Sequence, residues 1–171
     1  MQFRFKKVWD ETRQKLASEP QRRHARTSVE SRLVDGFESR VSIRDFVVTV
    51  DQPLGFGGSN KGPKPSEYVL AALAACQEVT YRLYADALGI PLRSVSVKAE
   101  GIQDLHGFLG VDPEGRPGFQ QVNVTVTLDS PAPAEDLERL KTTVDRHCPV
   151  LDDLRTPIAV SLTLVTTNGA G

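Results

Sequence analysis

Hydrophobic residues recur every three or four positions between residues 66 and 88, the spacing of one buried helix face. This stretch contains neither Gly nor Pro and is rich in Ala and Leu, which favour helices. Pro65 suits a first helical turn, and Gly89 followed by Pro91 is typical of a helix end. The predicted inward face carries Val69, Leu73, Cys76, Thr80, Leu83 and Ala87. The pattern therefore predicts one central helix, roughly 34 Å long, with a cysteine at its middle.

Residues 5–18 and residues 134–147 also have helical spacing. The first segment ends before Pro20 and the second before Pro149, because the residue ahead of a proline is disfavoured in helical geometry. Residues 151–154 are expected to add one helical turn. The predicted inward faces carry Val8, Trp9, Thr12 and Leu16 in the first segment, and Leu137, Leu140, Val144 and Cys148 in the second.

Alternating apolar and polar residues predict the strands. The predicted strands are residues 27–34, 39–43, 46–50, 93–100, 121–128 and 158–165. Asp35-Gly36 is a dipeptide favoured in tight hairpin turns, so the first three strands are expected to form a meander. The order β-β-β-α-β-β-α-β indicates an α+β fold built on antiparallel sheet.

The chain divides into a helical extension, residues 1–26, and one domain, residues 27–171. Arg22, Arg23 and Arg26 make the extension locally basic, but no nucleic-acid-binding motif accompanies them. We favour a small amphipathic helix that packs Trp9 and Leu16 on the domain or on a second subunit.

Composition narrows the classes of partner and compartment. A formal net charge of −1 gives no reason to expect nucleic acid or a membrane surface as partner. No apolar run approaches the ~18 residues of a membrane span, and the first residues lack the apolar region of a signal peptide. The expected location is the cytoplasm, where thiols stay reduced, so the two cysteines are expected to be reactive or simply buried.

Nucleotide and metal motifs are incomplete. The glycine-rich loop before the central helix lies where a phosphate cradle would lie, but Lys61 precedes Gly62 and no Gly-Lys-Ser/Thr follows. We expect this loop to let backbone approach a cleft beside the helix. His24, His106 and His147 are scattered without zinc-ligand spacing, so no metal is expected.

The two cysteines both continue the inward faces of predicted helices. Cys76 lies midway along the central helix, and Cys148 lies 72 positions later at the end of the second. Two helices packed on one sheet could bring the thiols together. The alternative is that each is a small buried hydrophobic residue, as free cysteines often are. The residue pattern alone leaves both interpretations open.

The segment P-S-E-Y-V-L-A-A-L-A-A-C and the later H-C-P resemble the OsmC/Ohr family of thiol-dependent peroxidases. The resemblance extends over roughly residues 27–165. It implies that Cys76 is the peroxidatic cysteine and Cys148 the resolving one. It also implies an intertwined homodimer that exchanges strands, active sites at the subunit interface, and no metal, haem or flavin.

The chemistry implied by the resemblance suits these residue types. A thiolate attacks the O–O bond of an organic hydroperoxide or of hydrogen peroxide and becomes a sulfenic acid. The second thiol condenses with it to a disulfide, and a dithiol reductant, a lipoyl protein or a thioredoxin-like protein, restores both thiols.

The resemblance also implies an Arg, held by a Glu, that activates the peroxidatic cysteine. Members of the Ohr type carry this Glu ten positions before the cysteine, where this chain has Ser66. The nearest acid, Glu67, lies nine positions before Cys76, which is half a turn away on the helix. Glu67 is a candidate for the catalytic Glu, and the alternative is an acidic residue at the helix start.

The activating Arg is expected in the predicted meander, which contains Arg32, Arg40 and Arg44. We select Arg40, just past the hairpin turn, and the alternative is an exposed strand residue. The predicted catalytic set is Cys76, Cys148, Arg40 and Glu67.

Two functions from different classes stay open. The first is a dithiol peroxidase. The second is a non-catalytic module that binds a small apolar molecule in a cleft near Cys76, or that senses redox state through its cysteines. The displaced Glu67 favours the second function.

Overall fold

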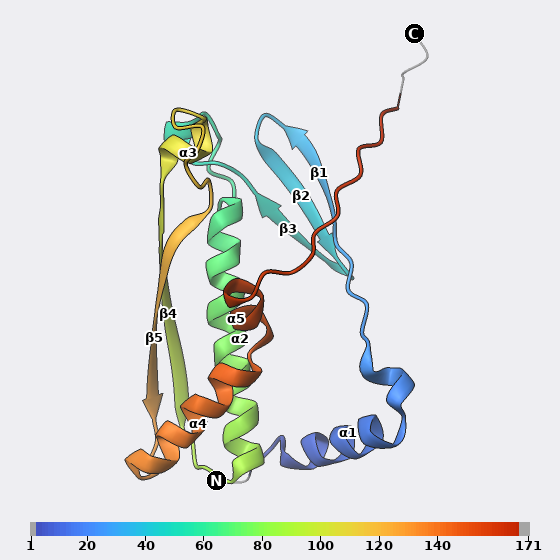
Figure 1. The fold of residues 1–171 in the computed structure, drawn as a ribbon, viewed down its shortest axis with the longest axis vertical. Coiled ribbons are helices and arrows are strands. Elements are labelled where there is room, and N and C mark those ends of the chain that lie inside the picture. The colour runs from blue at the N-terminus through green and yellow to red at the C-terminus, as the bar shows by residue number, and fades with distance from the viewer. Residues whose placement is uncertain (1–2, 168–171) are drawn as a thin grey trace.

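The structure is a computed structural model that describes residues 3–167 (Figure 1). Its helices are α1 (Lys6–Ser18), α2 (Pro65–Leu88), α3 (Leu105–Leu109), α4 (Ala134–His147) and α5 (Pro149–Arg155), with 3-10 turns at Pro20–Arg23 and Leu54–Phe56. Its strands are β1 (Glu30–Asp35), β2 (Glu38–Ile43), β3 (Phe46–Val50), β4 (Ser94–Gln103) and β5 (Phe119–Asp129). The predicted order of strands and helices is confirmed as far as α5, except that the short helix α3 between β4 and β5 was not predicted.

Helix α2 is the central element, with the β4–β5 hairpin on one side and the β1–β3 sheet on the other (Figure 1). It begins at Pro65, in a first turn where a missing N–H leaves no bond unmade. It ends at Gly89, which has the left-handed φ of 70° and donates its N–H to the carbonyls of Ala85 and Asp86. In the described part of the chain, none of the helices has the length and hydropathy needed to cross a bilayer.

The main hydrophobic core lies around the C-terminal half of α2, where that helix packs against β4 and α4. Its buried members are Tyr81, Ala85, Ile90, Leu92, Leu140 and Val144. Part of the predicted inward face of α2 is wrong, because Val69 is 38% exposed while Gln77, Tyr81 and Ala85 are buried. The buried face is displaced because α4 and β4 contact α2 from different sides, which periodicity in α2 alone does not encode.

The strands form two separate antiparallel sheets rather than one. The first has the order β1-β2-β3, and the second is the β4–β5 pair. Hairpin turns at Gly36, with a φ of 49°, and at Arg44, with a φ of 54°, join the strands of the meander. Helix α2 lies between the two sheets, so their strands do not join into one larger sheet (Figure 1).

The β1–β3 sheet has one apolar face that is only partly covered. Val41, Val48 and Val50 line a groove on this face together with Pro65 and Tyr68 from the start of α2. The hydroxyl of Tyr68 donates a hydrogen bond of 2.7 Å to the Thr49 carbonyl, which ties the helix start to β3. Much of the sheet therefore lacks a packing partner within one chain.

The predicted strand at residues 158–165 is wrong for the single chain. The segment is extended, but in residues 3–167 it pairs with no other strand and runs away from the helices (Figure 1). Leu162 and Leu164 are 92% and 90% exposed. A strand needs a neighbouring edge to satisfy its N–H and carbonyl groups, and in the described residues this segment lies along none of the sheet edges.

Candidate functional site

Two thiols from distant parts of the chain meet where α4 ends against α2. The Cys148 thiol donates a hydrogen bond to Cys76 Sγ, and the two sulfurs are 3.3 Å apart. Both cysteines are free thiols. A disulfide would require the sulfurs to approach to ~2.05 Å, which is a small displacement for two side chains already in contact.

Cys148 is held at the junction of two helices. Its N–H donates to the Val144 carbonyl at 2.9 Å, which closes the last turn of α4. Its carbonyl accepts the N–H of Asp152 at 3.0 Å, which opens α5. Pro149 prevents the two helices from merging, because it has no N–H and restricts the residue before it. The local sequence therefore fixes Cys148 in an extended conformation facing α2.

The two thiols lie in unlike surroundings. Cys148 is 1% exposed, whereas Cys76 is only half-buried and is the more accessible sulfur. Burial raises the pKa of the Cys148 thiol, the nearby Cys76 sulfur raises it further, and the Leu151 N–H opposes both effects. Cys148 therefore stays protonated at neutral pH and can donate to Cys76.

Thr80 belongs to this site, although its position in the sequence predicted only that it lies on the inward face of the helix. It lies one turn after Cys76, is buried, and donates its hydroxyl to the Cys76 carbonyl at 2.7 Å. The same hydroxyl faces Cys148 and opposes the rise in the pKa of that thiol. A hydroxyl that can turn between a carbonyl and a sulfur can stabilise a thiolate as it forms.

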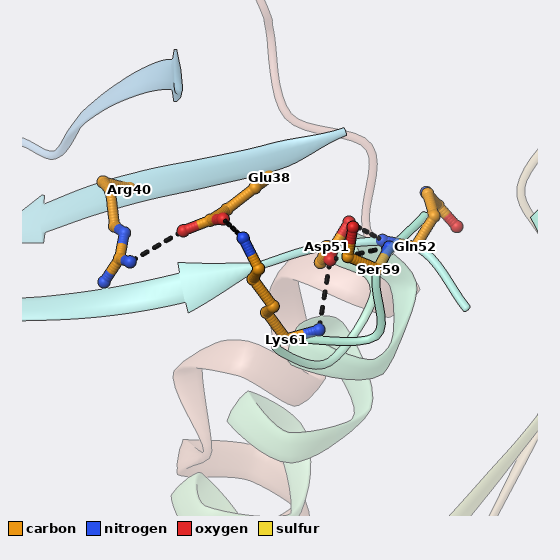
Figure 2. Close-up of polar contacts among 6 residues, drawn as sticks. All are labelled: Glu38, Arg40, Asp51, Gln52, Ser59 and Lys61. Atoms are coloured by element: carbon orange, nitrogen blue, oxygen red, sulfur yellow. Dashed lines mark hydrogen bonds and ion pairs between the residues drawn. The ribbon is translucent and has the colours of Figure 1, made fainter. Parts of the chain in front are cut away.

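Arg40 lies in a separate cluster of charges on β2. Its guanidinium donates to Glu38 at 2.7 Å, and the other Glu38 oxygen accepts from Lys61 Nζ at 2.6 Å (Figure 2). Glu38 is 5% exposed, so its charge is largely removed from water and shared between the two cations. The hydrogen bond from Lys61, followed by that from Arg40, lowers the pKa of Glu38. Glu38 is therefore ionised and fixes the direction of Arg40.

A buried carboxylate organises the loop that supplies Lys61. Asp51 accepts the N–H groups of Gln52, Ser59 and Lys61 at 2.7, 3.1 and 3.1 Å (Figure 2). The hydrogen bond from the Lys61 N–H is the main reason why the pKa of Asp51 is lowered. The protein's own carboxylate thus occupies the position that a phosphate would need.

Close backbone contact explains the glycines of this loop. A Cβ on Gly58 would lie only 2.0 Å from the Gln52 carbonyl oxygen. A Cβ on Gly62 would come within 2.3 Å of the Thr49 carbonyl oxygen. The loop therefore folds back on the end of β3, and any side chain at either position would displace it.

Glu67 lies at the start of α2, where its carboxylate accepts the Lys64 N–H at 2.9 Å. This contact closes a capping box, the helix-start position that the sequence left open as the alternative. Within the described residues, no hydrogen bond or ion pair joins Arg40 or Glu67 to either thiol. The structure thus brings together Cys76 and Cys148, and it brings Arg40 to Glu38 instead of Glu67.

Glu38, Asp51 and Lys61 were not predicted as site residues from the sequence. Glu38 had one usable signal, because residues two apart on a strand share a face and Arg40 is two positions later. Lys61 is 23 positions from Glu38, and no local pattern links them.

A cavity of about 810 Å³ lies beside the thiol site, between α2, β5 and α4. Leu73, Gln77 and Tyr81 line it from α2, and Val126 and Leu137 line it from the opposite elements. Across the described part of the chain, no three His, Cys, Asp or Glu side chains are grouped as metal ligands.

Comparison with protein families gives one match, to the family described as OsmC-like protein. The match covers residues 58–163, more than half of the chain, and includes both cysteines. No curated protein matches the sequence.

Three solved structures have similar folds. An OsmC-like protein from Mycoplasma pneumoniae has 21% identity and a TM-score of 0.68, over 78% of this chain and 89% of that one. The organic hydroperoxide resistance protein OsmC from Legionella pneumophila has 22% identity and a TM-score of 0.60, over 77% and 90%. An organic hydroperoxide resistance protein from Elizabethkingia anophelis has 18% identity and a TM-score of 0.58, over 80% and 92%. At these identities the likeness establishes the fold.

Proposed function

The chain belongs to the family of OsmC-like proteins, and on that premise we propose that it is a thiol-dependent peroxidase acting on organic hydroperoxides or hydrogen peroxide. One observation carries the proposal, the 3.3 Å contact between an accessible Cys76 sulfur and a buried Cys148 thiol. Two solved proteins of similar fold are described as organic hydroperoxide resistance proteins, which supports this class of substrate.

The reaction would proceed in two thiol steps. The Cys76 thiolate attacks one peroxide oxygen, the O–O bond breaks, and the other oxygen leaves as an alcohol after taking a proton. Cys76 is then a sulfenic acid. The Cys148 sulfur attacks the Cys76 sulfur, its proton leaves with the hydroxyl as water, and a disulfide forms.

A dithiol must complete the cycle, because the disulfide has consumed both thiols. Two exchange steps transfer the disulfide to the reductant and return Cys76 and Cys148 to their reduced forms. A lipoyl protein or a thioredoxin-like protein has the paired thiols that this exchange needs.

Arg40 is proposed as the cation that activates Cys76, with Glu38 taking the orienting role that the family resemblance gave to Glu67. The bond from Glu38 supports this, since a guanidinium held by a nearly buried carboxylate is fixed in direction. Arg40 has no thiol neighbour within the described single chain, so the proposal requires the second subunit. Glu67 is left as a residue that stabilises the start of α2.

The active form is proposed to be a homodimer in which a second copy covers the apolar face of the β1–β3 sheet and pairs with the segment at residues 158–165. Exposed Leu162 and Leu164 in an alternating extended segment support this occupant. Sedimentation at micromolar concentration should give twice the chain mass of 18.8 kDa. A monomer under those conditions would contradict the assembly.

The cavity beside α2 favours a second candidate function, a non-catalytic module that binds a small apolar molecule. Its volume, about 810 Å³, and its lining by Leu73, Val126 and Leu137 are typical of ligand sites. In that function the two cysteines would be packing residues or redox sensors.

Intact mass separates the two functions. After one equivalent of hydroperoxide, the peroxidase should rapidly lose two hydrogens per chain, as Cys76 and Cys148 form a disulfide. A binding module should change slowly or not at all. A slow change in the wild type that equals the change in Cys76→Ser would refute the peroxidase function.

A further inference from the structure

A row of three aromatic rings connects the N-terminal extension to the end of α4. Trp9 of α1 meets the ring of Tyr84 on α2 edge-on, with ring centres 5.0 Å apart. Tyr84 then stacks on His147, with ring centres 5.1 Å apart and planes inclined by 19°. His147 is the last residue of α4, and the next residue in the chain is Cys148.

These contacts are the principal attachment of α1. No residue of α1 is buried, and its predicted packing residue Leu16 is exposed. Trp9 is half-buried against Tyr84, and the N–H of Phe5 donates to the buried carboxylate of Asp86 at 2.9 Å. The extension is therefore fixed to α2 at two points, and one of them is the aromatic row.

Disulfide formation depends on the position of the end of α4. Cys148 must move its sulfur toward Cys76, and its backbone is set by the last turn of α4. Buried Val144 and Cys148 hold the inner side of that turn, and the exposed His147 adds a contact at its end by stacking on Tyr84. Tyr84 belongs to α2, the same helix that carries Cys76. The row thus joins the residue beside one thiol to the helix that carries the other.

We propose that Trp9 and His147 are positioning residues for the second step of the thiol reaction, and that the N-terminal extension holds Cys148 ready to attack oxidised Cys76. The inference rests on the proposed peroxidase function. It assigns the extension a role in disulfide formation and none in the attack on peroxide.

The test compares the two steps in full-length Trp9→Ala and wild type. Each protein is mixed with one equivalent of tert-butyl hydroperoxide and quenched at intervals with dimedone, and intact mass then counts sulfenic acid and disulfide. In Trp9→Ala, Cys76 oxidation should proceed at the wild-type rate. Disulfide formation should slow by roughly fivefold, within the range expected for loss of one aromatic pair, and dimedone adduct should accumulate.

Matched variants separate positioning from general damage. Val8→Ala changes an exposed neighbour of Trp9 and should leave both steps unchanged. His147→Ala should reproduce the Trp9→Ala defect, and His147→Phe, which keeps a flat ring, should restore rapid disulfide formation. Because His147 is exposed, its variants keep the test available if Trp9→Ala fails to fold.

The outcomes distinguish this inference from the function on which it rests. Wild-type rates of disulfide formation in folded Trp9→Ala and His147→Ala would overturn the positioning role and leave the peroxidase intact. Equal slowing of both steps would also overturn it, since that result indicates structural damage. Wild-type protein that forms no disulfide would refute the proposed function itself.

Discussion

The thiol site and the Glu38 cluster differ in how they are built. Cys148 is placed by apolar packing, because Leu140 and Val144 on the inner face of α4 are fully buried. Arg40 is placed by charge, through an ion pair on a sheet that is otherwise poorly covered. The thiol pair is complete within one chain, whereas the Glu38 cluster is complete only as an ion-pair network and reaches no thiol. Packing thus fixes the two thiols, and charge fixes the guanidinium that the proposed function assigns to their activation.

The largest expected effect comes from the thiols themselves. Cys76→Ser should abolish peroxide consumption, because the cysteine that remains, Cys148, is buried. Cys148→Ser should react once and stop at a sulfenic acid on Cys76, which dimedone traps and excess peroxide over-oxidises. A coupled assay with a dithiol and intact mass measures both results.

Either of two results would contradict the roles assigned to the two cysteines. Normal turnover of Cys148→Ser with a dithiol would remove its resolving role. Full activity in Cys76→Ser would make both cysteines ordinary buried residues.

The next effect tests whether packing supports only the thiol side of the molecule. Leu140→Ala removes a fully buried side chain of the core and should lower the free energy of unfolding by about 2–5 kcal/mol. At a protein concentration low enough to keep the chain monomeric, Leu33→Ala, on the exposed β1, should change it by less than about 0.5 kcal/mol. Thermal melts of both variants measure the contrast. Equal losses would mean that the β1–β3 sheet is as well packed as the core.

A smaller effect is expected at Arg40. If Arg40 activates Cys76, Arg40→Ala should slow alkylation of Cys76 near neutral pH by about tenfold. The loss of the cation would reduce the fraction of Cys76 present as thiolate by about that factor. Arg32→Ala and Arg44→Ala, from the same meander, are the matched controls and should alkylate at the wild-type rate.

Two carboxylate variants sharpen the same measurement. Glu38→Gln should share part of the Arg40→Ala defect, because it loses the charge that holds the guanidinium. Glu67→Gln should not, since Glu67 caps α2. Equal rates in all five variants would show that the activating charge comes from elsewhere.

The smallest effect is on stability against pH. The pKa of Glu38 is lowered in the folded protein, mainly by its bond to Lys61. The ionised group therefore stabilises the fold above the ordinary pKa of 4.5, and this stabilisation is lost as pH falls below that value. Between pH 7 and pH 3.5, the melting temperature should fall less in Glu38→Gln than in wild type. Parallel curves would mean that the ion pairs add nothing to stability.

Features encoded by neighbouring residues were predictable from the sequence. Pro65 and Gly89 set the ends of α2, and Pro149 ended α4, because these residues restrict their own backbone. The two inward helix faces allowed the thiols to meet, the family resemblance favoured it, and the two sulfurs are in contact.

Features that depend on a distant partner were not predictable. The buried side of α2 is chosen by α4 and β4, so its own periodicity placed Val69 inside when it is exposed. Residues 158–165 have strand alternation, but within the described residues they pair with no strand of their own chain. Glu38 depends on Lys61, which a folded loop brings from 23 positions away.

The aromatic row also gives the protein a built-in optical signal. Trp9 is the single tryptophan of the chain, and its ring touches Tyr84, which in turn touches the residue beside Cys148. Tryptophan emission depends on the groups around the indole and on energy received from nearby tyrosines. A shift of α4 during disulfide formation should therefore alter the fluorescence of unlabelled protein, so that successive oxidation and reduction can be followed continuously in a cuvette.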